Sequence, residues 1–206
     1  IFGEVIELGS DVKDVNIGDK RVIYPWIGCN QCDVCSSGDE HLCSGGPVLG
    51  VQKGGGFGDH VLVPHSRYLM DAGDTPDHLA GSYACSGLTA YTALKKAQIK
   101  DSNNSLVIVG AGGLGMMGIQ IAKAAFNVQP IVVDVDNKKL EIALKSGASH
   151  AINSKDEDAA ERIFSLTGGA ASVIDFVGSD LSTGFATNLL RTVSYTHLTL
   201  PTTLPV

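Results

Sequence analysis

The chain has little of what membrane-spanning or nucleic-acid-binding proteins need. No apolar run approaches the roughly 18–20 residues of a membrane-spanning helix, so we expect no membrane partner. Basic residues are few, since 15 Lys and Arg stand against 22 Asp and Glu, for a net charge of −7. Phosphate binding needs concentrated positive charge, so this balance argues against a nucleic-acid partner. With 206 residues, 44% of them hydrophobic, the chain can form one sizeable domain or two small ones.

Cysteine is scarce but concentrated. Four of the five cysteines fall within fifteen residues in the pattern C-x2-C-x2-C-x7-C: Cys29, Cys32, Cys35 and Cys43. Four thiolates this close in sequence can converge on one tetrahedral ion, and soft sulfur ligands favour zinc or an iron–sulfur cluster. We find no secretory signal, so this spacing indicates a metal site in a reducing, cytoplasmic compartment rather than a disulfide framework.

Three kinds of metal site compete for these cysteines. The acidic balance disfavours a zinc ribbon that binds nucleic acid, and the spacing does not match the common ferredoxin patterns. A structural zinc lobe is favoured, because four thiolates leave no open position for a substrate and can hold a loop that lacks its own core. His41 is an alternative ligand, although the four thiolates already complete the tetrahedron.

The fifth cysteine, Cys85, stands apart in the segment SYACSGLTAYTAL. A free cysteine is most often a small buried apolar side chain. The residues alone leave that interpretation and a ligand role both open.

The pattern along the chain changes near residue 70, where we place a domain boundary. Short β segments are predicted before it at 5–8, 21–24 and 60–63, the last stopped by a proline. After it, helical spacing covers 77–99.

Strands and helices then alternate. We expect strands at 106–109, 131–134, 150–152 and 173–177, and helices at 113–126, 137–146 and 157–167, with a further helix ending near 189–191. Alternation of this length predicts an α/β fold with a doubly wound parallel sheet and right-handed crossovers.

The strongest local motif is a glycine-rich turn between a strand and a helix, Gly110-Ala111-Gly112-Gly113-Leu114-Gly115. Its first glycine permits a tight turn, the second lets the backbone approach a pyrophosphate, and the third allows close helix–strand packing. Asp134 ends the next strand, nineteen residues after Gly115. A carboxylate there accepts hydrogen bonds from a ribose 2′-hydroxyl and repels a 2′-phosphate, which favours NAD over NADP.

The last fifteen residues, TVSYTHLTLPTTLPV, break the alternation. A doubly wound sheet should continue with a glycine turn and another Val/Ile strand. We therefore treat residues 192–206 as an atypical, non-native tail, with an ordinary flexible C-terminus as the alternative.

Taken in order, these parts resemble the zinc-dependent alcohol dehydrogenases of the medium-chain dehydrogenase/reductase superfamily. The matching segments, over residues 1 to about 191, are GEVIELG, GDKRV, the four-cysteine lobe, GGGFGDHVLVP, ACSGLTAYTAL, GAGGLG and VDVD. The resemblance implies a partial GroES-like β domain with a structural zinc lobe at 1–70, and a partial NAD-binding Rossmann domain at 71–191.

The resemblance also implies roles for single residues. Cys85 matches a ligand of the catalytic zinc, Thr89 would lie at the nicotinamide ring, and Leu114 would lie behind it. Lys139 matches a position that contacts the adenosine ribose beside Asp134.

In this family the catalytic zinc takes two cysteines and one histidine, and a Gly-His-Glu triplet should end immediately before Ile1. The chain thus holds one of three expected ligands. It also holds four of six expected parallel strands, so we expect it not to catalyse alone. We expect the strand at 173–177 to present an uncovered edge, which invites aggregation.

The function implied for the intact parent is hydride transfer between a primary or secondary alcohol and NAD, with a carbonyl as the other small-molecule partner. Dimers of this family pair their final strands, so we expect a homodimer or homotetramer. A polyol or threonine dehydrogenase is the close alternative, and a non-catalytic NAD-binding protein is another. The four-cysteine lobe and Cys85 argue against a zinc-free quinone oxidoreductase.

Overall fold

The computed structural model of the chain describes residues 1–97 and 105–198, and for residues 192–198 it describes the backbone alone. The chain forms two compact units that divide after Cys85. The change in sequence pattern near residue 70 remains our predicted boundary. Of the described helices, none combines the length and apolar character that crossing a bilayer requires.

The first unit contains a small antiparallel sheet in the order β1-β2-β3. Its strands are β1 (Phe2–Glu4), β2 (Lys20–Ile23) and β3 (Leu69–Asp71). Val22 pairs with Phe2 on one side and with Met70 on the other. The buried cluster under this sheet consists of Ile23, Ile27, Leu49 and Tyr68.

Only one of the three strands predicted for this unit is confirmed, the one at 21–24. The prediction at 5–8 is wrong because the hairpin closes at Val5, whose backbone N–H donates to the carbonyl of Asp19 at 2.9 Å. The prediction at 60–63 is wrong because β3 takes the third place in the sheet. The valines of that segment pack against the buried cluster without joining the ladder.

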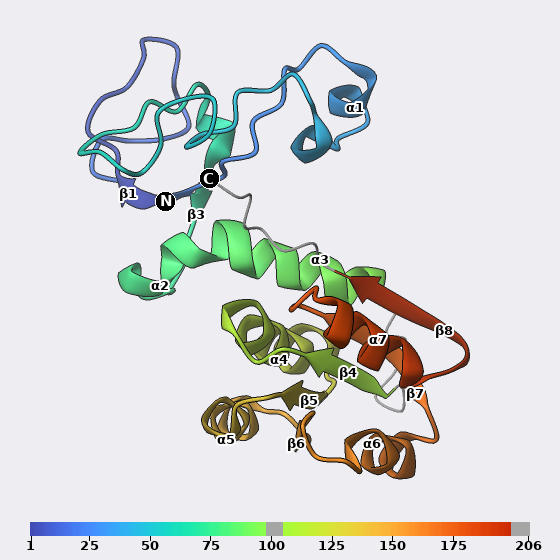
Figure 1. Cartoon of the computed structure of the whole chain (residues 1–206). Helices are drawn as coiled ribbons and strands as arrows, with labels where there is room; N and C mark the ends of the chain where they lie inside the picture. Colours follow the sequence, from blue (N-terminus) through green and yellow to red (C-terminus); the bar gives the residue numbers. More distant parts are fainter. Residues whose placement is uncertain (98–104, 199–206) are drawn as a thin grey trace. The chain divides into compact units, whose positions relative to one another are not determined.

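Short helical turns lie between β2 and β3. They are α1 (Asp33–Ser36), η1 (Glu40–Leu42) and η2 (Ser66–Tyr68), and α1 lies in a loop that projects from the small sheet (Figure 1). The helix α2 (Asp77–Ser82) follows β3. The helical spacing predicted over 77–99 is confirmed as far as Lys96, by α2, a π-helical turn η3 (Tyr83–Gly87) and α3 (Leu88–Lys96). Residues 98 and 99 lie outside the described residues.

The second unit is built on a parallel sheet in the order β6-β5-β4-β7-β8. Its strands are β4 (Leu106–Val109), β5 (Ile131–Asp134), β6 (His150–Asn153), β7 (Ala170–Asp175) and β8 (Leu190–Leu198). The chain starts in the middle of the sheet and winds outward in both directions, which is the doubly wound order. The predicted fold class is confirmed.

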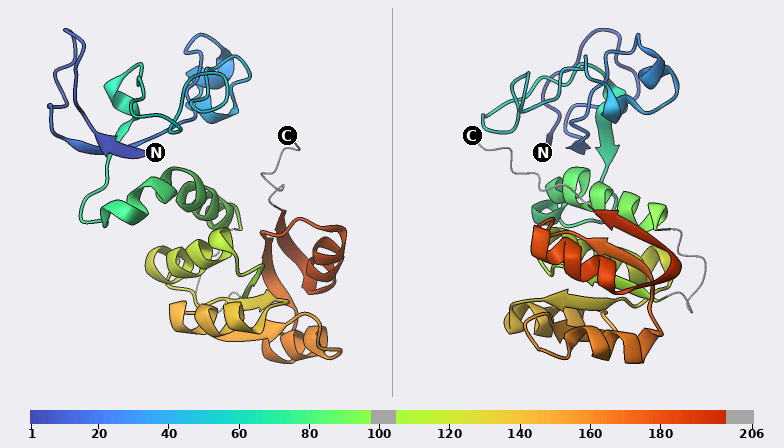
Figure 2. Two further views of the ribbon diagram at one scale, coloured as in Figure 1. Left: turned by 60° about the vertical axis from the view of Figure 1, so that its left-hand side comes forward. Right: turned by 45° about the vertical axis from the view of Figure 1, so that its right-hand side comes forward.

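Helices cover both faces of this sheet (Figure 2). One face carries α3, α4 (Gly113–Phe126) and α5 (Asn137–Ser146), and the other carries α6 (Ala159–Thr167) and α7 (Asp180–Asn188). Successive strand residues point to opposite faces, so Ile108 packs in one cluster with Ile119 of α4. Val107 packs in the other cluster with Ile163 of α6. Burial on both faces explains why β4 is a continuous apolar run.

The expectation of an uncovered β7 edge is wrong. Strand β8 pairs with β7 in parallel, with Ser172 opposite Tyr195 and Asp175 opposite Leu198. The physical reason is that the free edge of β7 offers unpaired backbone groups, and the stretch TVSYT has the β-branched and aromatic residues that favour strands. The preceding helix, α7, ends at Asn188. Residues 199–206 of the predicted tail lie outside the described residues.

Candidate metal and nucleotide sites

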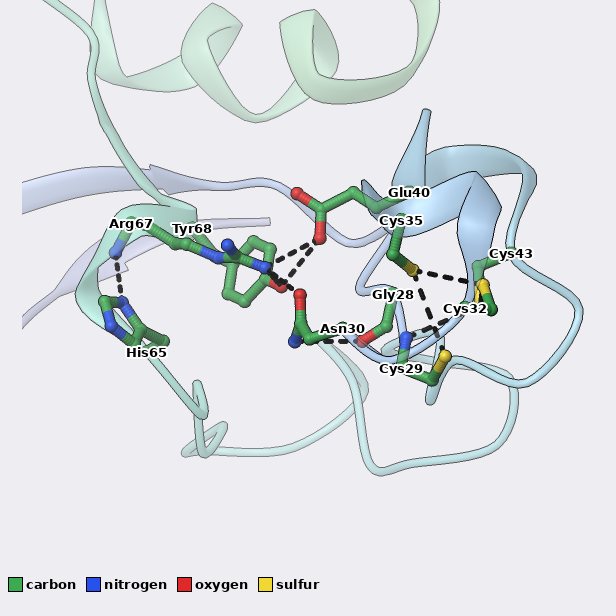
Figure 3. Close-up of polar contacts among 10 residues, drawn as sticks. All are labelled: Gly28, Cys29, Asn30, Cys32, Cys35, Glu40, Cys43, His65, Arg67 and Tyr68. Atoms are coloured by element: carbon green, nitrogen blue, oxygen red, sulfur yellow. Dashed lines mark hydrogen bonds and ion pairs between the residues drawn. The ribbon is translucent and has the colours of Figure 1, made fainter. Parts of the chain in front are cut away.

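The four clustered cysteines bring their sulfur atoms together in the first unit (Figure 3). All four Sγ atoms lie within 4.8 Å of one another. The separation is 3.6 Å between Cys32 and Cys35, 3.8 Å between Cys32 and Cys43, and 4.0 Å between Cys29 and Cys35. Zinc–sulfur bonds of about 2.3 Å in a tetrahedron place sulfur atoms about 3.8 Å apart. The geometry therefore fits a four-thiolate zinc ion.

Local structure explains how the ligands converge. Cys32 is the N-cap of α1, and Cys35 lies three residues on, so one helical turn places both side chains on the same side. The chain reverses just after Cys29, where Asn30 adopts a left-handed backbone with φ of 61°. Cys43 follows η1 directly. His41 is exposed within η1 and lies outside the group of potential ligands.

Backbone N–H groups and burial shift the pKa values of two of the four thiols in opposite directions. The N–H of Cys29 donates to Cys43 Sγ at 3.4 Å. Backbone N–H groups of Cys29 and Gly45 lower the pKa of the Cys43 thiol to about 6. Desolvation raises the pKa of the Cys35 thiol to about 11. Zinc coordinates thiolates, so binding of a dication displaces whatever thiol protons remain.

The two residues that family resemblance assigns to catalysis lie elsewhere in the chain. Cys85 is exposed in the π-helical turn η3, and it joins no group of potential metal ligands in the part of the chain that the structure describes. Thr89 is half-buried in the first turn of α3. Their catalytic roles remain predictions.

The glycine-rich turn lies where β4 ends and α4 begins. Gly110 has a φ of +95°, which only glycine adopts readily. A Cβ on Gly115 would lie 1.8 Å from the carbonyl oxygen of Gly110, so this residue permits the close approach of α4 to the strand end. A Cβ on Gly112 would meet nothing within 4 Å. The space beside Gly112 therefore suits a ligand, and the space beside Gly115 is filled by the protein.

The N-terminus of α4 has the features of an anion site. Its N-cap is Gly112, which offers no side chain to cap the helix. The first backbone N–H groups of a helix point outward and carry partial positive charge. Gly113 and Leu114, in the first turn, are exposed and half-buried respectively. A pyrophosphate would satisfy these donors.

Asp134 joins the glycine-rich turn to the end of β5. Its Oδ2 accepts a hydrogen bond from the N–H of Ala111 at 2.7 Å, and its Oδ1 accepts one from the N–H of Asp136 at 3.0 Å. The carboxylate is half-buried, and its remaining lone pairs can accept hydrogen bonds from ribose hydroxyls. Lys139 is exposed in the first turn of α5, the helix that follows β5.

Asp175 is a further polar residue of this region, and the sequence pattern did not identify it as a site residue. Asp175 ends β7 and is fully buried. It accepts hydrogen bonds from the N–H of Val177 at 2.8 Å and from the hydroxyl of Ser182 at 2.8 Å. The loop that it shapes brings Val177 Cγ2 within 2.7 Å of a Cβ placed on Gly110. The available signal was a carboxylate that closes an apolar strand beside the switch point between β4 and β7.

Comparison with known families agrees with both units. Residues 1–74 match the alcohol dehydrogenase GroES-like domain. Residues 113–192 match the zinc-binding dehydrogenase family. Together these matches agree with the predicted resemblance to the zinc-dependent alcohol dehydrogenases.

Named relatives support this placement. An NAD-dependent alcohol dehydrogenase from Sulfolobus acidocaldarius is 40% identical over 184 residues, which are 89% of this chain and 53% of that protein. The D-arabinose dehydrogenase structure from Sulfolobus solfataricus superposes with a TM-score of 0.86 at 27% identity, over 98% of this chain and 66% of that one. The alcohol dehydrogenase TADH from Thermus sp. ATN1 gives a TM-score of 0.86 at 25% identity, over 100% of this chain and 61% of that one. The chain spans about half the length of the curated relatives it matches.

Proposed function

We propose that this chain belongs to a zinc-dependent oxidoreductase that transfers a hydride between an alcohol and NAD. The observation that carries the proposal is the glycine-rich turn, where Gly112 leaves open space at an uncapped helix N-terminus beside the carboxylate of Asp134. The names of the curated relatives agree with this chemistry.

Different residues of this chain would bind different parts of NAD. The nicotinamide ring of NAD supplies the hydride acceptor. Residues 110–115 would hold the pyrophosphate by backbone N–H groups, and Asp134 would accept hydrogen bonds from the adenosine ribose. Lys139 would lie at the same ribose. Thr89 and Leu114 would contact the nicotinamide ring, and so orient it for hydride transfer.

The cysteines would bind two zinc ions with different roles. The four-cysteine cluster would bind a structural ion, which stabilises its loop. Cys85 would be one ligand of a catalytic ion, which supplies a Lewis acid for the substrate oxygen when bound. The exposure of Cys85 leaves its sulfur accessible for that role.

The substrate would be a small alcohol. A polyol or threonine dehydrogenase of the same superfamily is the alternative. One structural relative is named a D-arabinose dehydrogenase, which supports this alternative. We also propose a cytoplasmic protein, because thiolate ligands need reducing conditions, and a homodimer or homotetramer.

The nucleotide part of the proposal is tested by titrating the 206-residue chain with NADH and NADPH in a calorimeter. We expect NADH to bind and NADPH to bind more weakly, since Asp134 repels a 2′-phosphate. Asp134→Asn should reduce that preference. A folded chain that binds neither nucleotide would refute the nucleotide site.

The catalytic part is tested on the full-length protein by alcohol-dependent reduction of NAD and by zinc content. We expect about two zinc ions per chain. Cys85→Ala should lose one ion and the activity while the structural ion stays. A full-length protein with one zinc ion and no activity on any alcohol would support the non-catalytic NAD-binding alternative.

A further inference from the structure

One arginine, Arg67, contacts two separate segments of the four-cysteine lobe (Figure 3). The guanidinium of Arg67 donates hydrogen bonds to Asn30 Oδ1 and, at 2.8 Å, to Glu40 Oε2, which lie 37 and 27 residues earlier in the chain. Asn30 directly follows Cys29, and Glu40 opens the turn that leads to Cys43. A single cation therefore connects two segments that carry sulfur ligands.

Arg67 is itself held in place by the core of the first unit. Its backbone N–H donates to His65 Nδ1 at 3.1 Å. Its Cζ lies 4.7 Å from the ring centroid of Tyr68, and its guanidinium also donates to the Tyr68 hydroxyl. The Tyr68 ring is buried and stacks on Tyr24, with centroids 6.4 Å apart and planes 8° from parallel. The arginine thus joins the lobe to a rigid aromatic pair.

Glu40 transmits this support to the ligands. Its Oε2 accepts a second hydrogen bond, from the hydroxyl of Tyr68 at 2.9 Å. A Cβ placed on Gly28 would lie 2.6 Å from both Glu40 Cβ and Cys35 Sγ, so these groups pack closely around the glycine. Asn30 is tied to the same glycine, since its Nδ2 donates to the Gly28 carbonyl at 3.3 Å. Movement at Glu40 or Asn30 therefore disturbs the ligand positions.

We propose that Arg67 is a positioning residue of the metal lobe. By connecting Asn30 and Glu40 to Tyr68, it holds the two ligand-bearing segments at the separation that a four-thiolate ion needs, and so slows release of the ion. Partners outside the ligand shell commonly orient metal ligands in this way. The inference rests on the structural zinc site proposed above.

The test measures zinc release from the loaded 206-residue chain to excess 4-(2-pyridylazo)resorcinol. Arg67→Met keeps the side-chain stem and removes the charge and the donors. We expect release about 10–100-fold faster than from the wild type, which assigns to the release rate the whole loss of metal affinity typical for such a partner. Arg67→Lys should not restore slow release, because the shorter lysine side chain does not reach the position of Nη2, the atom that donates to Asn30, Glu40 and Tyr68.

Arg162→Met is the matched control. Arg162 has the same side-chain exposure as Arg67, 45%, and forms a similar ion pair, with Asp156 at 3.0 Å, in the second unit. We expect this variant to release zinc at the wild-type rate.

Two conservative variants separate the contacts of Arg67. Glu40→Gln keeps an acceptor but removes the charge, and Asn30→Gly keeps the left-handed backbone but removes the amide. We expect each to accelerate release by less than Arg67→Met. We expect Glu40→Gln to add little when Arg67 is already Met, because both changes break the same ion pair.

A spectroscopic measurement distinguishes positioning from general loss of stability. With saturating cadmium-113, the wild-type chain should give one sharp resonance of a four-sulfur site. Arg67→Met should keep the four-sulfur shift but broaden the line, since the ligand geometry becomes heterogeneous.

The outcomes are distinguishable. Release from Arg67→Met at the wild-type rate, with an unchanged cadmium line, overturns the role of Arg67 and leaves the metal site standing. A folded wild-type chain that takes up no zinc overturns the metal site and this inference together. If Arg67→Met does not fold, wild-type release rates in both Glu40→Gln and Asn30→Gly overturn the inference.

Discussion

The two units of this chain reach a folded state by different means. In the part of the chain that the structure describes, the largest fully buried side chains all belong to the second unit, among them Leu94, Ile108 and Leu189. The apolar ones form two clusters, one on each face of the parallel sheet. The first unit buries a cluster of four residues beneath a three-stranded sheet, and most of its chain lacks regular structure.

The difference indicates where each unit obtains its stability. Burial of apolar surface, at about 25 cal/mol per Å², is the main source of stability that we expect for the second unit. We expect the first unit to depend on specific contacts: the metal ion that four cysteines would bind, the ion pair of Arg67 with Glu40, and the stacked pair of Tyr24 and Tyr68. The units should therefore respond differently to metal removal and to core truncation.

The largest effect should come from the metal ligands. Cys32→Ser should abolish zinc binding by the 206-residue chain and unfold the lobe, since structural zinc contributes on the order of 10 kcal/mol in small metal-folded domains. Zinc content and urea unfolding measure the change. Cys85→Ser is the control, because Cys85 lies outside the cluster. Full zinc content in Cys32→Ser would contradict the structural-zinc assignment.

Core truncation of the second unit should come next. Ile108 is fully buried in the middle strand, so Ile108→Ala should lower the free energy of unfolding of that unit by about 2–5 kcal/mol. Zinc content should stay at the wild-type value. A simultaneous loss of zinc would show that the units do not fold separately.

A pair of glycine substitutions should have smaller, separable effects. Gly115→Ala places a methyl group 1.8 Å from a backbone carbonyl, and such overpacking costs about 1–3 kcal/mol. Gly112→Ala meets no atom within 4 Å, so stability should change little. Both variants should bind NADH more weakly, Gly112→Ala because its methyl group occupies the ligand's space. Calorimetry and thermal unfolding measure the two effects, and unweakened NADH binding by Gly112→Ala would refute the assigned position of the pyrophosphate.

The smallest effect should come from a surface ion pair of the second unit. Arg162 pairs with Asp156 with both side chains nearly half exposed. Arg162→Ala should change the free energy of unfolding by less than about 1 kcal/mol, and less still at high salt. Urea unfolding at two salt concentrations measures it. A larger loss would show that charge contacts carry more of this unit's stability than its apolar core suggests.

Much of the second unit could be predicted from sequence. The strands at 106–109 and 131–134 and the helices at 113–126 and 137–146 agree with the structure, whereas the strand predicted at 173–177 forms at Ala170–Asp175. Their signals are local, because burial on both faces of the sheet makes each strand a continuous apolar run.

The first unit could not be predicted as well, because its strands depend on partners. Residues 60–63 have the apolar, β-branched composition of a strand but pair with no strand of the described sheet. The edge of β2 pairs instead with β3, Leu69–Asp71. Strand β8 was missed for the related reason that the edge of β7 selects it. Whether a segment becomes a strand depends also on the segment it pairs with, and the sequence pattern of one segment does not reveal that partner.

The candidate sites follow the same division. Spacing alone brought together the four cysteines and identified the glycine-rich turn, because those ligands and donors are close in sequence. Asp175 and Arg67 were missed. The contact of Arg67 with Asn30 spans 37 positions, which no spacing rule joins. Asp175 bonds to Val177 and Ser182 nearby in sequence, but a single carboxylate after an apolar strand is too weak a pattern to single out.

The difference between the two units is tested most directly by amide hydrogen exchange of the 206-residue chain, with zinc bound and after a chelator has removed it. We predict that amides of the four-cysteine lobe and its flanking turns lose protection, while those of β4, β5 and β7 exchange at unchanged rates. Equal loss of protection in both units, or no loss in either, would contradict the conclusion that a metal ion stabilises the first unit and an apolar core the second.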